Sequence, residues 1–147
     1  MSQRMLELLV VEDNPADVRL IREGLKRPCA DMGLNVRLAE DGEQALKMLL
    51  DDGYRPDMIL LDLSLPRIDG QTVLQRVRAH GISLSATPII VFSSSQHGIQ
   101  EIIDSGANTY IVKPGSLNEY LKAIERFAIL WLKPLAEKPA AKDNSAA

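Results

Sequence analysis

The sequence contains few cysteine, histidine and aromatic residues, and each scarcity excludes a class of function. Its single cysteine, Cys29, cannot form an intramolecular disulfide, and with only two histidines the chain has no Cys/His cluster to hold zinc. Aromatic residues make up 4% of the chain, which leaves few side chains on which nucleic acid bases could stack. We therefore expect neither a disulfide-stabilised fold nor a zinc site.

Long apolar runs and an excess of positive charge are also absent. The 17 basic and 20 acidic residues give a formal net charge of −3, so nothing attracts the chain generally to nucleic acid or anionic membranes. No segment approaches the ~18–20 apolar residues of a membrane span, and the first apolar run is too short for a signal peptide. We expect a cytoplasmic protein that binds neither DNA nor membrane.

Five short apolar runs predict β-strands. At 147 residues, 46% hydrophobic and 25% charged, the chain has the size and composition of one globular domain. Several runs are apolar almost throughout, which is typical of parallel strands that are buried on both faces. The runs are residues 6–11, 36–39, 58–61, 89–92 and 110–112.

A segment with helical periodicity follows each run. Asn14 and Pro15 predict the N-cap and first residue of the first helix, and Ser116 predicts the N-cap of the last. Gly81 is placed to end the third helix, and Pro134 lies beyond the end of the fifth. Strands that alternate with single helices require right-handed crossovers. The sequence therefore predicts an α/β fold: a doubly wound (βα)5 domain with helices on both faces of a parallel sheet.

The composition changes near the C-terminus. After Pro134 the chain is rich in Ala, Lys, Pro, Glu and Ser, and it has no further periodic apolar pattern. We predict one domain over residues 6–133 and a flexible tail over residues 134–147.

Polar side chains follow four of the apolar runs. Glu12 and Asp13 end the first run, Asp62 the third, Ser93 the fourth and Lys113 the fifth. Ligands bind outside the carboxyl ends of such strands, so these groups are expected at one edge of the sheet. Three neighbouring carboxylates stay ionised at low cost only around a cation, and oxygen ligands suit Mg²⁺. Mg²⁺ beside a lysine can neutralise phosphate oxygens, and a central carboxylate such as Asp62 can act as a nucleophile.

Three segments, taken in order, resemble the receiver domain of two-component response regulators. They are residues 8–14 (LLVVEDN), residues 58–70 (MILLDLSLPRIDG) and residues 110–114 (YIVKP). The resemblance covers residues 6–132 and implies the flavodoxin-like fold, with strand order 2-1-3-4-5. It also implies Mg²⁺-dependent transfer of a phosphoryl group from a phosphohistidine on a partner kinase to an aspartate.

The resemblance assigns the phosphoacceptor and the metal ligands. Asp62 takes the position of the phosphoacceptor. Glu12, Asp13 and Asp62 take the positions of the Mg²⁺ carboxylates, directly or through water, with the main-chain carbonyl of Ser64 as a further ligand. Ser64 also matches a variable position beside the path of the attacking water.

The remaining implied roles concern the phosphoryl group and its switch. Ser93 takes the position of the hydroxyl that binds a phosphoryl oxygen, and Lys113 would contact the same group, with a cis peptide to Pro114. Tyr110 matches the aromatic residue whose ring moves inward when the Ser93 loop closes. Ser95 matches a second variable position beside the water path.

The C-terminal segment points to partners. Residues 127–134 (FAILWLKP) are similar to stand-alone regulators linked to bacterial phytochrome kinases. The implied partner is a sensor histidine kinase of the phytochrome photoreceptor type, which would dock mainly against the first helix. Because no output domain is expected after residue 132, output would pass through a phosphotransfer or effector protein, or through a homodimer of the fourth helix, fifth strand and fifth helix. Phe127, Leu130 and Trp131 would extend that surface, although Trp131 could instead pack against its own domain.

Other functions fit the sequence less well. An aspartyl phosphohydrolase needs a second acid two residues after its nucleophile, where this chain has Ser64. A flavin carrier needs a phosphate-binding loop after the first strand, where this chain has the acidic pair Glu12 and Asp13. The protein is therefore expected to be a phosphoacceptor rather than an enzyme that acts on other substrates. A scaffold that signals without phosphorylation is the alternative, although the complete acid set and Lys113 argue against it.

Overall fold

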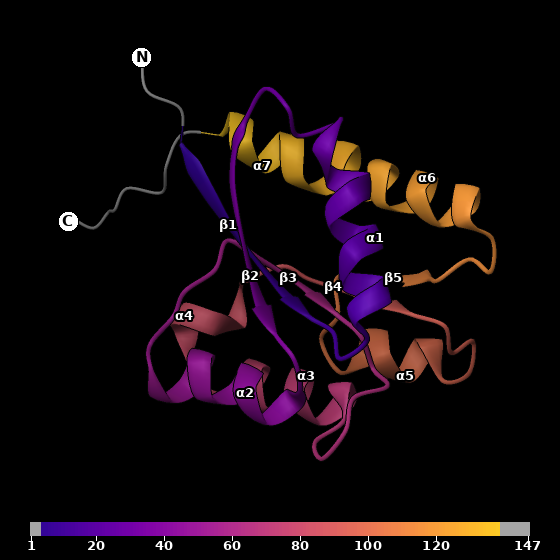
Figure 1. Ribbon diagram of the computed structural model, residues 1–147. Helices are drawn as coiled ribbons and strands as arrows, with labels where there is room; N and C mark the ends of the chain where they lie inside the picture. Colours follow the sequence, from indigo (N-terminus) through magenta and orange to yellow (C-terminus); the bar gives the residue numbers. More distant parts are fainter. Residues whose placement is uncertain (1–3, 139–147) are drawn as a thin grey trace.

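The computed structural model describes residues 4–138, in which a parallel sheet lies between two layers of helices (Figure 1). The strands follow the order β2-β1-β3-β4-β5, which confirms the predicted fold class. They are β1 (Met5–Val11), β2 (Gly33–Ala39), β3 (Met58–Leu61), β4 (Ile89–Ser93) and β5 (Thr109–Val112). The bounds of β3 agree with the prediction at both ends, and the other strands begin or end within a few residues of it.

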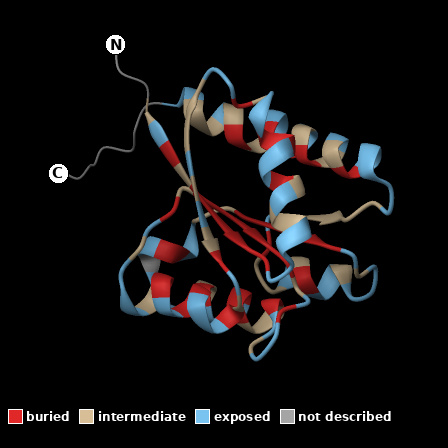
Figure 2. Ribbon diagram, in the orientation of Figure 1, coloured by how far each residue is buried: buried red, intermediate tan, exposed pale blue. Residues whose placement is uncertain are grey.

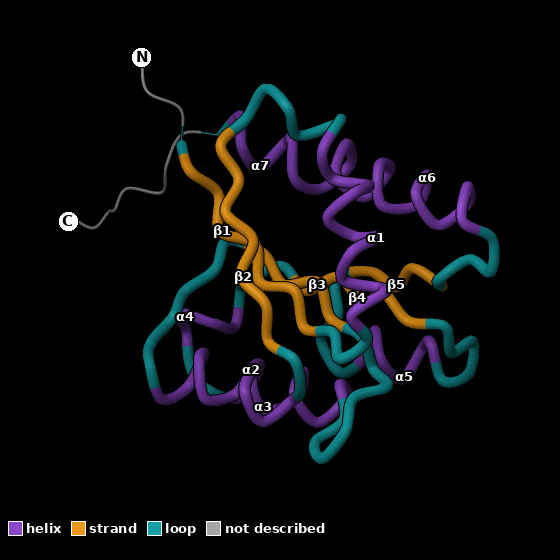
Figure 3. Tube along the Cα trace, in the orientation of Figure 1, coloured by secondary structure: helices purple, strands orange, loops and turns teal. Residues whose placement is uncertain are grey.

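Helices cover both faces of the sheet, as Figure 3 shows. On one face lie α1 (Pro15–Lys26), α6 (Leu117–Phe127) with its π-helical continuation η2 (Ala128–Leu132), and α7 (Lys133–Glu137). On the other lie α2 (Gly42–Leu46) with its π-helical continuation η1 (Lys47–Asp51), α3 (Gly70–Ala79), α4 (Ile82–Ser85) and α5 (Ile99–Asp104). The predicted fourth and fifth helices therefore correspond to α5 and α6, because the short α4 was not predicted.

Side chains of the central strands alternate between two apolar cores. Leu8 and Val10 pack with residues of α1 and α6, whereas Leu9 and Val11 pack with residues of α2 and α3. All four residues of β3 are buried, and the buried residues gather at the sheet (Figure 2). Burial on both faces explains why the strands are nearly continuous apolar runs.

The predicted helix starts are confirmed. The side chain of Asn14 accepts hydrogen bonds from the backbone N–H groups of Ala16 and Asp17, and that of Ser116 accepts one from Glu119. Pro15 occupies the first turn of α1, where its missing N–H costs no hydrogen bond. The caps fix where α1 and α6 leave the edge of the sheet that carries the acidic residues.

The C-terminal helical region continues past the predicted boundary. Pro134 lies in the first turn of α7, which runs to Glu137, so the expectation of a flexible tail from residue 134 is corrected for this turn. α7 continues from η2 without a break, since the N–H of Lys133 donates to the carbonyl of Ala128, and Pro134 has no N–H to donate. Arg4 holds this segment to the start of β1 by donating to the carbonyl of Leu135 (3.0 Å). The rest of the predicted tail, residues 139–147, lies outside the described residues.

Between residues 4 and 138, every helix is too short or too polar to cross a membrane.

Candidate functional site

The strand register brings the polar strand ends together. Val11 of β1 is paired with Leu61 of β3, and the ladder continues as the N–H of Asp62 donates to the carbonyl of Val11 (3.0 Å). At the other side of the site, the N–H of Lys113 donates to the carbonyl of Ser93 (2.9 Å). Backbone hydrogen bonds between neighbouring strands thus fix the positions of the backbone at Asp62, Ser93 and Lys113.

Three carboxylates form a candidate metal site. Glu12, Asp13 and Asp62 can each offer an oxygen such that the three atoms lie within 4.8 Å of one another. Glu12 and Asp62 are buried, whereas Asp13 is exposed and leaves one side open to solvent. Carboxylate oxygens with room for waters fit Mg²⁺, which prefers octahedral oxygen ligation.

Lys113 contacts three carboxylates, two that follow β1 and β3 and one on α1. Its Nζ lies 2.8 Å from Glu12, 3.3 Å from Asp62 and 3.3 Å from Asp17. Burial acts to lower the pKa of Lys113, but the hydrogen bond to Glu12 and the three negative charges outweigh it and raise the pKa. The ammonium therefore stays charged beside Asp62.

Glu12 has a strongly shifted acidity. Burial raises the pKa of Glu12 from 4.5 to about 7, and the negative charge of Asp62 adds to this rise against the opposing effect of Lys113. The other oxygen of Glu12 accepts a hydrogen bond from the N–H of Asn14 (3.2 Å). A cation among the carboxylates would favour the ionised form of Glu12.

Ser93 carries the one buried side-chain oxygen or nitrogen between residues 4 and 138 that has no hydrogen-bond partner. It ends β4, beside the strand end that carries Lys113, and it is fully buried. An unpaired buried hydroxyl costs free energy, so the Ser93 hydroxyl is available to a ligand that can accept its hydrogen bond. A phosphoryl oxygen, which accepts hydrogen bonds, fits this donor.

The predicted switch residues lie along β4 and β5. The hydroxyl of Tyr110 donates to the main-chain carbonyl of Ser95 (2.6 Å), which joins the half-buried ring to the loop after Ser93. Ser64 donates its N–H to Asp62 (3.2 Å). The predicted cis peptide before Pro114 is wrong, because residues 4–138 contain no cis peptide bond. The trans form, which X–Pro bonds favour by about 0.5–1 kcal/mol, is the one observed.

Two residues near Lys113 were missed by the sequence analysis. Asp17, in the first turn of α1, contacts Lys113, and its other oxygen accepts a hydrogen bond from the hydroxyl of Tyr120 on α6 (2.7 Å). In the sequence, Asp17 has only the pattern of a first-turn helix acid and Tyr120 that of a core residue. The one available signal was the position of Asp17 near a strand end that carries acids.

The predicted interface residues do not share one environment. Phe127 is 1% exposed and belongs to the core, so its assignment to an interface is corrected; it lies on the face of α6 that packs against the sheet. Leu130 is 61% exposed. Trp131 is half-buried against the core and lines a groove with Leu130 beside β5. The packing of Trp131 against its own domain is therefore observed in part, whereas its role at an interface stays a prediction.

Residues 8–125 match the model of the response regulator receiver domain family. The response regulator MprA of Mycolicibacterium vanbaalenii is 36% identical over 118 residues, which are 79% of this chain and 47% of MprA. MprA of Mycobacterium avium is 37% identical over 118 residues, which are 79% of this chain and 48% of MprA. This chain spans about half the length of the curated relatives it matches.

The similar solved structures include phytochrome-linked regulators. The phosphorylated cyanobacterial phytochrome response regulator RcpA is 32% identical with a TM-score of 0.82, covering 89% of this chain and 96% of RcpA. The response regulator Rcp1, described in a Mn²⁺-bound form, is 29% identical with a TM-score of 0.81, covering 87% of this chain and 95% of Rcp1. The bacteriophytochrome response regulator AtBRR is 32% identical with a TM-score of 0.64, covering 87% of this chain and 96% of AtBRR.

Proposed function

Because this chain belongs to the family of response regulator receiver domains, we propose that it accepts a phosphoryl group on Asp62 from the phosphohistidine of a sensor histidine kinase. Receiver domains typically are phosphoacceptors rather than enzymes. The observation that carries the proposal is the buried, unpartnered hydroxyl of Ser93 at the sheet edge where Asp62 and Lys113 also lie. Together they offer a nucleophile, a hydroxyl donor and a cation to one phosphoryl group.

The transfer needs no further co-reactant. A carboxylate oxygen of Asp62 forms a bond to phosphorus while the phosphorus–nitrogen bond of the donor breaks, and the electron pair returns to the imidazole. Lys113, whose ammonium lies 3.3 Å from Asp62, would contact one incoming phosphoryl oxygen, and the hydroxyl of Ser93 would donate a hydrogen bond to another. Glu12, Asp13 and Asp62, with the Ser64 carbonyl, would hold Mg²⁺, whose charge neutralises the phosphoryl oxygens.

Phosphorylation is tested by incubating the full chain with acetyl phosphate and Mg²⁺ and recording its intact mass. We expect a gain of one phosphoryl group that needs Mg²⁺ and is lost in Asp62→Asn. Asp57→Asn is the matched control, since Asp57 lies before β3, at the opposite end of this strand. If neither the wild type nor Asp57→Asn gains mass while another receiver domain is labelled in parallel, the scaffold alternative replaces the phosphoacceptor proposal.

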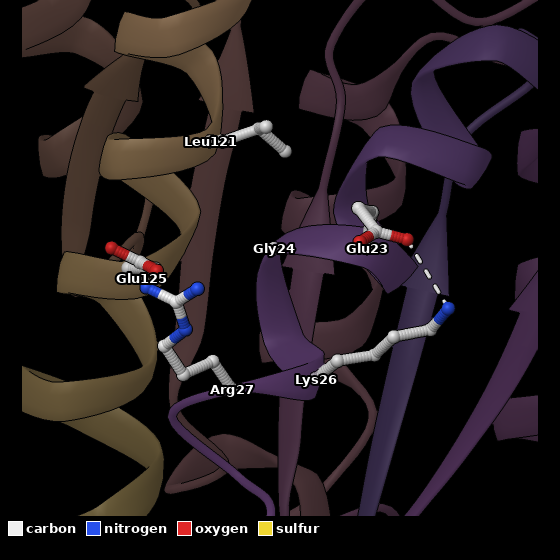
Figure 4. Close-up of a pocket in the computed structure, with 6 residues that line it drawn as sticks. All are labelled: Glu23, Gly24, Lys26, Arg27, Leu121 and Glu125. Carbon is white, nitrogen blue, oxygen red and sulfur yellow. Dashed lines mark hydrogen bonds and ion pairs between the residues drawn. The ribbon is translucent and has the colours of Figure 1, made fainter.

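The kinase is proposed to dock at α1. A groove between α1 and α6 is lined by Glu23, Gly24, Lys26, Arg27, Leu121 and Glu125 (Figure 4). The helices meet closely here, since a Cβ on Gly24 would lie 2.7 Å from Ile124. Leu121 offers an apolar contact between charged side chains of both signs, which suits a partner helix with a mixed polar and apolar face. By likeness to RcpA and AtBRR, the kinase would be of the phytochrome type.

Output is proposed to pass through the face formed by α5, β5 and α6, either to a phosphotransfer or effector protein or to a second copy of the chain. Supporting this, Leu130 is 61% exposed in η2 and lines a groove beside β5 together with Trp131. Exposed apolar clusters of this kind mark interaction surfaces. Tyr110 of β5 also lines the groove and contacts the loop after Ser93, so phosphorylation could bias this face.

We expect Leu130→Arg to weaken self-association of the phosphorylated chain at least tenfold, because it places a charge in the apolar patch. Sedimentation velocity before and after treatment with acetyl phosphate measures this. Leu117→Arg is the control, since Leu117 is 58% exposed at the far end of α6. A chain that stays monomeric at tens of micromolar when phosphorylated would exclude the homodimer and leave the effector.

A further inference from the structure

We propose that Asp17, held by the hydroxyl of Tyr120, positions Lys113 at the phosphoryl site. The effect on phosphoryl transfer rests on the proposed function, whereas the contacts of Asp17 with Lys113 and Tyr120 are present without phosphorylation. The ammonium of Lys113 lies 3.3 Å from one oxygen of Asp17, and the hydroxyl of Tyr120 lies 2.7 Å from the other. A hydroxyl, a carboxylate and an ammonium thus form one chain across α6, α1 and the end of β5.

Asp17 differs from the other two carboxylates that contact Lys113. Glu12 and Asp62 both belong to the candidate metal site, whereas Asp17 does not. When a cation binds, Glu12 and Asp62 share their charge with it, and their hold on the ammonium weakens. Asp17 is then the carboxylate that keeps Lys113 in place for a phosphoryl oxygen.

Tyr120 makes Asp17 a fixed group rather than a mobile surface acid. The ring of Tyr120 is 5% exposed and packs edge-on against Phe92, with centroids 5.1 Å apart and planes at 77°. Burial and the charge of Asp17 raise the pKa of Tyr120, so the hydroxyl remains a proton donor. The centroid of the Phe92 ring also lies 5.7 Å from the ammonium of Lys113. Tyr120 and Lys113, which contact Asp17 from two sides, therefore both lie against this one buried ring.

The ordinary explanation of Asp17 is that a first-turn acid stabilises its own helix. Such a role needs no contact with Lys113 and no hydroxyl from α6. It predicts that Asp17→Asn lowers stability slightly and that Tyr120→Phe changes only the packing of the core. The two roles therefore differ in what happens at the Lys113 ammonium.

The deciding measurement is the NMR signal of the Lys113 ammonium in the metal-free full chain, assigned by its loss in Lys113→Met. With a side chain 9% exposed and three carboxylate partners, the ammonium should exchange its protons slowly with water. We expect Asp17→Asn and Tyr120→Phe each to speed this exchange at least fivefold. Two matched controls should leave it unchanged: Glu23→Gln, which removes a charge elsewhere on α1, and Tyr54→Phe, which removes a hydroxyl bonded to Glu7.

The rate of phosphorylation by acetyl phosphate at saturating Mg²⁺ gives the second readout. We expect Asp17→Asn to slow it about tenfold and Tyr120→Phe about threefold, with the double variant no slower than Asp17→Asn, since Tyr120 acts through Asp17. Equal ammonium exchange in wild type, Asp17→Asn and Tyr120→Phe overturns the inference, as does a wild-type ammonium that exchanges as fast as an exposed lysine. A changed ammonium signal in a chain that takes no phosphoryl group would refute the proposed function alone.

Discussion

Replacing Lys113 by methionine is expected to lower the free energy of unfolding of the metal-free protein by about 3 kcal/mol near neutral pH. The substitution leaves Glu12 and Asp62, which are 2% and 5% exposed, without the ammonium that lies 2.8 and 3.3 Å away. Methionine keeps an unbranched apolar stem, so packing near Phe92 is largely preserved. The loss would therefore report the cost of buried carboxylates that have lost their cation, measured by urea unfolding in EDTA.

Adding Mg²⁺ to the same unfolding experiment should reverse part of this loss. Mg²⁺ should stabilise Lys113→Met more than the wild type, because the cation meets the same carboxylates without a competing ammonium. Lys47→Met is the matched control: its ammonium pairs with Asp52, but both side chains are more than half exposed, so the expected change is under about 0.5 kcal/mol. A Lys113→Met protein as stable in EDTA as the wild type would contradict the charge balance described for this site.

The sequence could predict the sheet because the relevant signals are local. Residues 58–61 are apolar at every position, and the structure buries each of them as β3. The caps at Asn14 and Ser116 likewise depend on a side chain bonding to a backbone group two or three residues away. The helical turn after Pro134 escaped prediction for the opposite reason, since it is held by Arg4 from the other end of the chain.

The candidate site also combines features that local sequence signals predict with features that depend on distant contacts. Glu12, Asp13 and Asp62 could be placed together from the ends of parallel strands alone, because strand direction fixes which edge they share. The contact between Asp17 and Tyr120 joins residues that are 103 positions apart, and only the packing of α1 on α6 creates it. The lack of a hydrogen-bond partner for the Ser93 hydroxyl could not be predicted from the sequence either, because it depends on the hydrogen bonds that all the surrounding groups make.

The stability of the metal-free wild type is expected to fall as the pH rises from about 4.5 to about 7, by roughly 2–3 kcal/mol from Glu12. Below this window Glu12 is protonated in both the folded and the unfolded chain, so it adds no pH dependence. Within it, the folded chain keeps the proton that the unfolded chain has lost, because burial raises the pKa of the folded Glu12. Unfolding then releases a proton, and a higher pH favours it.

Glu12→Gln separates this effect from other titrating groups. Glutamine is neutral at every pH, so the variant should lose the fall between pH 4.5 and 7, whereas Glu23→Gln, at a largely exposed position, should keep it. Mg²⁺ should also flatten the wild-type curve, since a cation among Glu12, Asp13 and Asp62 favours the ionised carboxylate. Urea midpoints across the pH range, with EDTA or with Mg²⁺, test both expectations. If the curves of the wild type and Glu12→Gln run parallel in EDTA, the pKa of Glu12 is not raised in the folded chain, and the ammonium of Lys113 compensates for its burial.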